Sequence, residues 1–111
     1  MATYVIVTMT VHDTEMYREY TSRSPPILKR HGGRFLTRGT EVSTIEGEKF
    51  MERMVILEFP SRTNVDAFFK DPEYVEIAKF RHAASVGRVV VQEGPWTLKL
   101  RGQMCKYVIT Q

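Results

Sequence analysis

Two charged residues interrupt apolar runs of the sequence and are the first candidates for chemistry. Arg38 stands in a β-rich run over residues 34–45, and Glu58 stands in another over residues 49–59. Burying either charge without a partner is costly, so we expect the two side chains to form an ion pair across adjacent strands. In a structural role this pair stabilises the sheet or a dimer. In a functional role Arg38 fixes a carboxylate or enolate while Glu58 orients the ligand or takes a proton. Arg53 lies on the same run as Glu58 and is interpreted as an exposed arginine.

Three tyrosines and a further arginine have helical spacing. Tyr17 and Tyr20 are three positions apart, and Tyr74 and Arg81 are seven positions apart, so each pair lies on one helix face. The first pair either packs in the core with its hydroxyls at the edge or lines a pocket between helix and sheet. The second pair either holds an anion together or anchors its helix to the sheet.

The histidines and the cysteine give little support for a metal or a cofactor. His31 is predicted at a helix C-terminus, where the helix dipole favours a protonated imidazole; contact with a ligand is the alternative. His12, His31 and His82 are isolated from one another, and Cys105 is the single cysteine, so we predict no metal site. Haem ligation by His82 is an alternative without a motif behind it. The sequence has no glycine-rich phosphate loop and no nucleophile motif, so we predict no cofactor.

The elements that must position these residues follow from the hydrophobic patterns. Residues 3–11 are rich in β-branched and aromatic types, which predicts a strand covered on both faces. Residues 14–31 have helical spacing, with Thr14 as the expected N-cap. The Pro25-Pro26 pair predicts a kink or a division of this helix into two pieces, and the two glycines after His31 end it.

The rest of the sequence predicts three more strands and two more helices. The remaining elements are predicted strands over 34–45 and 49–59, a helix from Ser61, a helix over 72–85 after the Asp71-Pro72 break, and a strand over 87–93. Gly47 lies in a short polar connection, which is typical of an antiparallel hairpin. The order predicts an α+β, ferredoxin-like βαββαβ sandwich, in which helices cover one face of a four-stranded antiparallel sheet.

The other face of this sheet is predicted to be apolar. In the first strand Val5, Val7 and Met9 share one parity and Tyr4 and Ile6 share the other, so both faces carry large apolar side chains. An uncovered apolar face of that size marks an interface. We therefore expect a two-fold homodimer that packs sheet against sheet into an α/β barrel.

Length and composition limit the organisation of the chain. Its 111 residues hold one domain, which we assign to residues 1–94; residues 95–111 are predicted to form a β hairpin or an arm that contacts the partner. The net charge of +3 comes from scattered basic residues, so we expect no nucleic-acid partner. No apolar run approaches the roughly 20 residues of a membrane span, and the N-terminus lacks a leader pattern, so we expect a cytoplasmic protein without a membrane partner.

Many short segments together resemble one known family. They are Tyr17-Arg18-Glu19-Tyr20, Pro25-Pro26, residues 31–39 (HGGRFLTRG), Glu46-Gly47, residues 55–61 (VILEFPS), Asp71-Pro72-Glu73-Tyr74, Arg81 and Gln92-Glu93-Gly94. In order and spacing they resemble the family called domain of unknown function 1330, a branch of the dimeric α/β-barrel superfamily. The resemblance implies the ferredoxin-like fold and the sheet-to-sheet dimer over residues 3–94, and it implies no settled activity.

The wider superfamily includes cofactor-independent monooxygenases, lactone isomerases, polyketide cyclases, haem-dependent members and non-catalytic members. The resemblance therefore gives only an analogy for function. The cyclases have a histidine-containing segment where this chain has Asp71 to Tyr74, so no histidine base carries over to this segment.

The leading functional hypothesis is a homodimer with one pocket per subunit between helices and sheet. It binds a small hydrophobic or aromatic acid and, as a cofactor-independent isomerase, cyclase or monooxygenase, acts by acid–base chemistry on a carbonyl or carboxylic compound. The predicted catalytic residues are Arg38, Glu58 and Tyr74, and the predicted substrate-binding residues are Tyr17, Tyr20, His31 and Arg81. The alternative is a non-catalytic dimer that binds a small ligand or serves as a regulatory module.

Overall fold

The structure, a computed structural model, describes residues 2–94 and is built around a first strand whose side chains alternate between two faces. The elements are β1 (Thr3–Val11), α1 (Thr14–Arg30), β2 (Arg34–Phe35), β3 (Arg53–Phe59), α2 (Arg62–Lys70), α3 (Pro72–Ala84) and β4 (Ser85–Glu93). Thr3, Val5, Val7 and Met9 are buried, whereas the residues between them are only half-buried. β1 therefore presents one face to a packed core and the other away from it.

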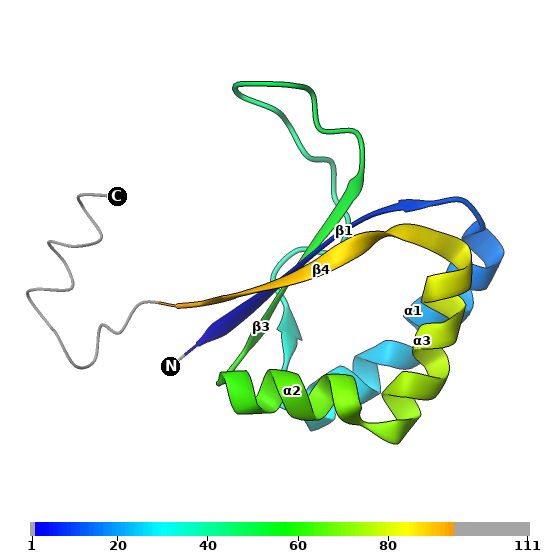
Figure 1. The fold of residues 1–111 in the computed structure, drawn as a ribbon, viewed down its shortest axis with the longest axis vertical. Coiled ribbons are helices and arrows are strands. Elements are labelled where there is room, and N and C mark those ends of the chain that lie inside the picture. The colour runs from blue at the N-terminus through cyan, green and yellow to red at the C-terminus, as the bar shows by residue number, and fades with distance from the viewer. Residues whose placement is uncertain (1, 95–111) are drawn as a thin grey trace, which may run out of the picture.

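The strands form one antiparallel sheet in the order β2-β3-β1-β4. Figure 1 shows the helices gathered on a single side of this sheet. The core lies between the two layers and includes Val5, Leu57, Phe59, Val65 and Ile27. The predicted ferredoxin-like α+β sandwich is confirmed, with its second helical segment divided into α2 and α3 at Asp71.

The first helix is one continuous helix, and its N-cap lies one residue earlier than predicted. Asp13 is the N-cap, and its side chain accepts a hydrogen bond from the Met16 backbone N–H, so the prediction of Thr14 was wrong. α1 also continues through both prolines, so of the two expected outcomes, a kink or a division into two pieces, the division is wrong. Pro26 and Ser22 are exposed, so water can reach the Ser22 carbonyl that loses its intrahelical donor.

The hairpin is the largest departure from the sequence prediction. β2 pairs antiparallel with β3 as predicted, but β2 has two residues instead of the predicted run over 34–45, and β3 begins at Arg53 instead of 49. Thr37 explains where the ladder ends, because its side-chain hydroxyl accepts the hydrogen bond from the Ile56 N–H. Gly39 then turns the chain away with φ +81°. Residues 36–52 form a long loop that extends away from the helices in Figure 1.

The predicted helix starts of the second half agree with the structure. Ser61 caps α2 by accepting from the Asn64 N–H, and Pro72 opens α3 directly after its Asp71 N-cap. α3 ends at Ala84 and β4 starts at Ser85, two residues before the predicted start at 87. Among the described residues, no helix has the length and apolar character needed to cross a bilayer. The predicted hairpin or arm over 95–111 lies outside the described residues.

The sheet face opposite the helices has an apolar row across its strands. Ile6 lies between Ile56 on β3 and Val90 on β4 in the strand register, and Leu36, whose N–H donates to the Ile56 carbonyl, extends the row beyond β3. Leu36 is 45% exposed and Val90 is 48% exposed. The single chain therefore leaves large aliphatic side chains of this row in contact with solvent.

Candidate cationic cavity

A cavity of about 320 Å³ lies between α1 and the sheet. This volume falls at the lower end of the ~300–1,000 Å³ range of small-molecule sites. Its wall is apolar toward the sheet and the core, and its charged lining residues are all arginines. The lining residues are Val7, Met9, Thr14, Tyr17, Arg18, Tyr20, Thr21, Ser24, Leu28, Phe35, Arg38, Arg53, Val55, Leu57, Phe68 and Arg81.

Helical spacing places the α1 contributors on one wall. Tyr17, Thr21, Ser24 and Leu28 follow one another at three or four residues, so their side chains project from one face of α1. Tyr17, Ser24 and Leu28 are buried. Tyr17 and Tyr20 both line the cavity, which agrees with the second of the two alternatives considered for them, a pocket between helix and sheet.

Arginines and tyrosines alternate along this wall. The Arg53 Cζ lies 5.5 Å from the centre of the Tyr17 ring, and the Arg81 Cζ lies 5.6 Å from the centre of the Tyr20 ring. The two tyrosine rings are 5.9 Å apart. Cations over aromatic faces are favourable, and this stacking holds each guanidinium against the wall.

The inner end of the wall is a hydrogen-bonded cluster. The Tyr20 and Tyr74 hydroxyls are 2.9 Å apart, and an Arg81 Nη2 donates to the Tyr74 hydroxyl at 3.5 Å. Burial, followed by the neighbouring Tyr74, raises the pKa of Tyr20 above its usual range, so its hydroxyl stays protonated at neutral pH. The Nε–H of Arg81 is buried and has no hydrogen-bond partner among the described residues.

Two further arginines come from the β2–β3 side of the cavity and are exposed. The Arg38 Cζ lies 4.4 Å above the Phe35 ring, and an Arg53 Nη2 donates to the Arg38 backbone carbonyl at 3.4 Å. A side chain at Gly39 would collide with the Arg53 guanidinium. The glycine therefore allows the loop to pass directly over this arginine.

The predicted ion pair between Arg38 and Glu58 is wrong. The strand register pairs Glu58 with Arg34, and their side chains form the ion pair at 2.6 Å. Glu58 alternates with buried Leu57 and Phe59, so it belongs to the sheet face away from the helices. There it also accepts a hydrogen bond from Tyr4, which raises the pKa of that tyrosine. Arg38 lines the cavity and Glu58 does not.

His31 and Tyr74 also lie outside the set of lining residues. Tyr74 is buried behind the wall and reaches the cavity only through Tyr20 and Arg81. His31 is the C-cap of α1, at the helix end that the sequence predicted. The cavity therefore brings together Arg38, Tyr17, Tyr20 and Arg81 from the predicted site, but not Glu58, Tyr74 or His31.

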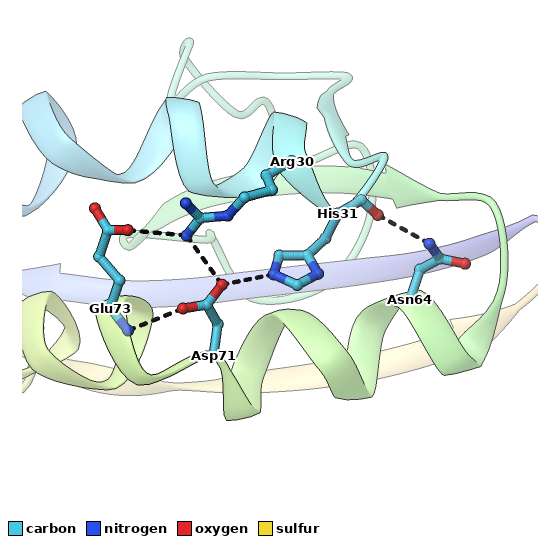
Figure 2. Close-up of polar contacts among 5 residues, drawn as sticks. All are labelled: Arg30, His31, Asn64, Asp71 and Glu73. Carbon is cyan, nitrogen blue, oxygen red and sulfur yellow. Dashed lines mark hydrogen bonds and ion pairs between the residues drawn. The ribbon is translucent and has the colours of Figure 1, made fainter.

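His31 belongs instead to a polar cluster between helices (Figure 2). Its Nε2 lies 2.7 Å from an Asp71 carboxylate oxygen, which also accepts from Arg30, and Arg30 reaches Glu73 as well. The hydrogen bond from His31 is the main cause that lowers the pKa of Asp71 to about 2; hydrogen bonds from the Glu73 N–H and Arg30 act in the same direction. The Asn64 side chain donates to the His31 carbonyl. This cluster ties the end of α1 to α2 and to the start of α3.

Arg53 is the cavity residue whose role the sequence interpretation left out. Its predicted exposure is correct, but it also shares parity with buried Val55 and Leu57 on β3 and pairs with Met9 in the register, and it lines the cavity. The period-two alternation of a strand was the available signal: it puts residue 53 on the helix side of the sheet and residue 58 on the opposite side. Residues 2–94 contain no group of three metal-ligating side chains that could hold an ion.

Comparison with solved structures agrees with a ferredoxin-like fold. A protein of unknown function from Rhodopseudomonas palustris is 22% identical, with a TM-score of 0.73 over 84% of this chain and 82% of that one. SnoaB, a cofactor-independent oxygenase from Streptomyces nogalater, is 15% identical, with a TM-score of 0.61 over 87% and 96%. A dimeric protein of unknown function and ferredoxin-like fold from Bacteroides fragilis is 16% identical, with a TM-score of 0.53 over 84% and 96%.

The sequence itself defines the family. Residues 2–95 match the family described as Domain of unknown function (DUF1330), and the chain belongs to that family. No match to this chain was found among curated proteins.

Proposed function

We propose that the cavity binds a small hydrophobic or aromatic carbonyl or carboxylic compound in its anionic form, and that the protein acts on this compound without a cofactor. The observation that carries the proposal is the lining itself. Arg38, Arg53 and Arg81 face an apolar cavity, and the ion pairs of the described residues occupy other cations. Guanidinium groups against an apolar wall favour a ligand with an apolar body and a negative charge.

The proposed chemistry is stabilisation of an enolate. Arginine side chains near a carbonyl oxygen would bind the enolate more tightly than the neutral ketone, which lowers the barrier to removing the adjacent proton. Glu58 lies on the other sheet face and the raised pKa of Tyr20 keeps its hydroxyl protonated, so a tyrosine hydroxyl of the wall would donate a hydrogen bond to the enolate oxygen while solvent takes up the proton from carbon. Tyr74 would act behind Tyr20 through their hydrogen bond.

The fold neighbours support this proposal only in general terms. SnoaB is a cofactor-independent oxygenase with the same fold, so a fold of this type can carry chemistry that needs no bound cofactor. The identity between the chains is too low to transfer a residue or a substrate.

A homodimer is part of the same proposal. The apolar row of Leu36, Ile56, Ile6 and Val90 is the surface that a second copy would cover, sheet against sheet. The Bacteroides fragilis neighbour of the same fold is a dimer, which supports this arrangement. We propose a cytoplasmic homodimer with one cavity in each subunit.

The second candidate is a non-catalytic dimer that binds the same anion. It is favoured by one observation: among the described residues that line the cavity, none is a carboxylate or an imidazole, the usual general bases. The two candidates share the ligand and differ only in whether the bound compound reacts.

Binding is tested with two compounds of the same shape, 2-naphthoate and 2-naphthamide, by isothermal titration calorimetry. A charge-assisted hydrogen bond contributes about 1.5–3 kcal/mol, so the naphthoate should bind roughly 10- to 100-fold more tightly. Arg81→Gln should reduce this preference. Lys79→Gln, which removes a positive charge two residues away on the exposed side of α3, should retain it. Equal affinity for the two compounds would contradict the proposal.

Catalysis is tested by deuterium exchange at the acidic carbon of 2-tetralone in D₂O, followed by NMR. The enzymatic candidate predicts exchange faster than in buffer and slower again in Arg38→Gln or Arg81→Gln. Exchange at the buffer rate while 2-naphthoate still binds would contradict the enzymatic candidate and support the binding module.

A further inference from the structure

Four arginines line the cavity: Arg18 is exposed on α1, and the other three fall into two sets with different surroundings. Arg81 comes from α3, is half-buried and contacts Tyr20 and Tyr74. Arg38 and Arg53 come from the β2–β3 side and are both exposed. We call Arg81 the inner arginine and the other two the rim arginines.

The inner arginine has unused hydrogen-bonding capacity. A guanidinium carries five N–H donors. The hydrogen bonds that Arg81 makes with Tyr74 and with the neighbouring His82 both use Nη2, and the buried Nε–H has no partner among the described residues. A buried donor without a partner is unfavourable. The Nη1 atom also makes no hydrogen bond within residues 2–94 and is not buried, so it can receive an anionic oxygen from a ligand.

The rim arginines are held together in a different way. Arg53 donates to the Arg38 backbone carbonyl through Nη2, which ties the Arg53 side chain to the chain segment that carries Arg38. Each guanidinium lies over an aromatic ring, Arg38 over Phe35 and Arg53 over Tyr17. Neither stacking contact neutralises the positive charge, so this second site also favours an anion.

Apolar and aromatic surface separates the two sets. Arg53 stacks on Tyr17 and Arg81 stacks on Tyr20, one helical turn further along α1, and Val7 and Val55 of the sheet line the same cavity. A single carboxylate would satisfy only one set. It would leave the other as uncompensated positive charge beside a space that has an apolar wall.

We propose that the ligand is a dianion: a compact, planar apolar body with two acidic groups, one for the inner arginine and one for the rim arginines. This inference rests on the proposed function, since it assumes that the cavity binds an anion. It adds the number of charges on the ligand and assigns Arg81 and Arg53 as specificity-determining residues for separate charges.

The test compares benzoate with the three benzenedicarboxylates, phthalate, isophthalate and terephthalate, by calorimetric titration of the full chain. At least one dicarboxylate should bind about tenfold or more tightly than benzoate, a difference that each added charge-assisted hydrogen bond can supply. Arg81→Gln and Arg53→Gln should each lower the affinity for the preferred dicarboxylate to the affinity for benzoate. Lys79→Gln should leave the preference unchanged.

The outcomes separate this inference from the proposed function. Binding of benzoate with equal or weaker binding of all three dicarboxylates would overturn the dianion and leave the anion pocket intact. Absence of binding by all four compounds, together with equal binding of 2-naphthoate and 2-naphthamide, would overturn both. A dicarboxylate preference that survives in both arginine variants would overturn the assignment of these residues.

Discussion

Tyr20 contributes both to the stability of the fold and to the cavity, through its hydroxyl and its ring. Tyr20 supplies its ring to the lining and its hydroxyl to Tyr74, which in turn accepts from Arg81. The sequence predicted that Tyr17 and Tyr20 share a helix face, because this depends only on helical spacing. It could not predict the contact between Tyr20 and Tyr74, since they lie 54 residues apart and meet only when α1 packs on α3.

Replacing Tyr20 by Phe should keep the ring and remove this hydrogen bond. We expect a loss of about 1 kcal/mol in the free energy of unfolding, typical of one partly buried hydrogen bond. Urea denaturation at pH 7 measures it. Tyr4→Phe, on the opposite sheet face, serves as a control for binding. Tyr20→Phe should weaken 2-naphthoate binding because the Tyr74 hydroxyl, which accepts from Arg81, loses its second partner, and Tyr4→Phe should leave binding unchanged.

The same tyrosine predicts how stability changes at alkaline pH. The pKa of Tyr20 is raised in the folded protein, so the unfolded chain ionises first, at about 10. The stabilisation is complete below that pH and is lost as the pH rises further toward the folded pKa. Between pH 9 and 11 the wild type should therefore lose stability more steeply than Tyr20→Phe. Parallel slopes for the two proteins would contradict this assignment.

At the scale of elements, the corner between α1, α2 and α3 depends on one carboxylate. Asp71 caps α3, and it also accepts from His31 and Arg30 at the end of α1. The Asp71-Pro72 break was predictable from the sequence because proline fits the first turn of a helix. The partners from α1 were not, since they depend on how the helices pack.

Asp71→Asn should show what the charge of this carboxylate contributes. Asparagine also caps helices well, so the substitution removes the charge and retains an acceptor for the Glu73 N–H. The folded pKa of about 2 lies below the ordinary aspartate value of 3.8, so the charge stabilises the fold above about pH 4, and this contribution is lost as the pH falls toward 2. Thermal unfolding should show a lower Tm for the variant at pH 7.

The acid range separates this prediction from a general loss of stability. Near pH 2 the difference in Tm between wild type and Asp71→Asn should shrink, because the wild-type carboxyl is by then about half protonated. Asp66→Asn, in an exposed pair with Arg62 on α2, should change the Tm little at either pH. A difference for Asp71→Asn that is the same at pH 7 and pH 2 would exclude the charge as its cause.

The hairpin shows where element prediction from the sequence ends. Residues 34–45 have β-type composition, but composition does not reveal that Thr37 substitutes its hydroxyl for a backbone partner of Ile56. Side-chain hydrogen bonds of this kind compete with the strand ladder. Alternation along β3, by contrast, is visible in the sequence, and it places Arg53 and Glu58 on opposite faces of the sheet.

At the scale of the whole molecule, the apolar row on the open sheet face predicts the homodimer. Val90→Glu should place a charge in the proposed interface and convert the dimer into a monomer, because an unpaired buried charge is strongly unfavourable. Light scattering after size-exclusion chromatography measures the mass. Val75→Glu is the matched control: Val75 on α3 is 48% exposed, as is Val90, but lies on the helix side.

These two variants distinguish an interface from a general effect of added charge. The wild type and Val75→Glu should have the mass of two chains, and Val90→Glu should have the mass of one. A monomeric wild type would contradict the dimer. If Val90→Glu is still a dimer, the interface does not lie on this face of the sheet.

The most direct test of the anion cavity is a crystal structure of the full chain grown with 2-naphthoate. We predict the naphthalene ring between the α1 tyrosines and the sheet, with its carboxylate in hydrogen-bond contact with Arg81 or with the rim arginines Arg38 and Arg53. A cavity that remains free of the compound at saturating concentration, or a carboxylate that points to solvent away from all three arginines, would contradict the account.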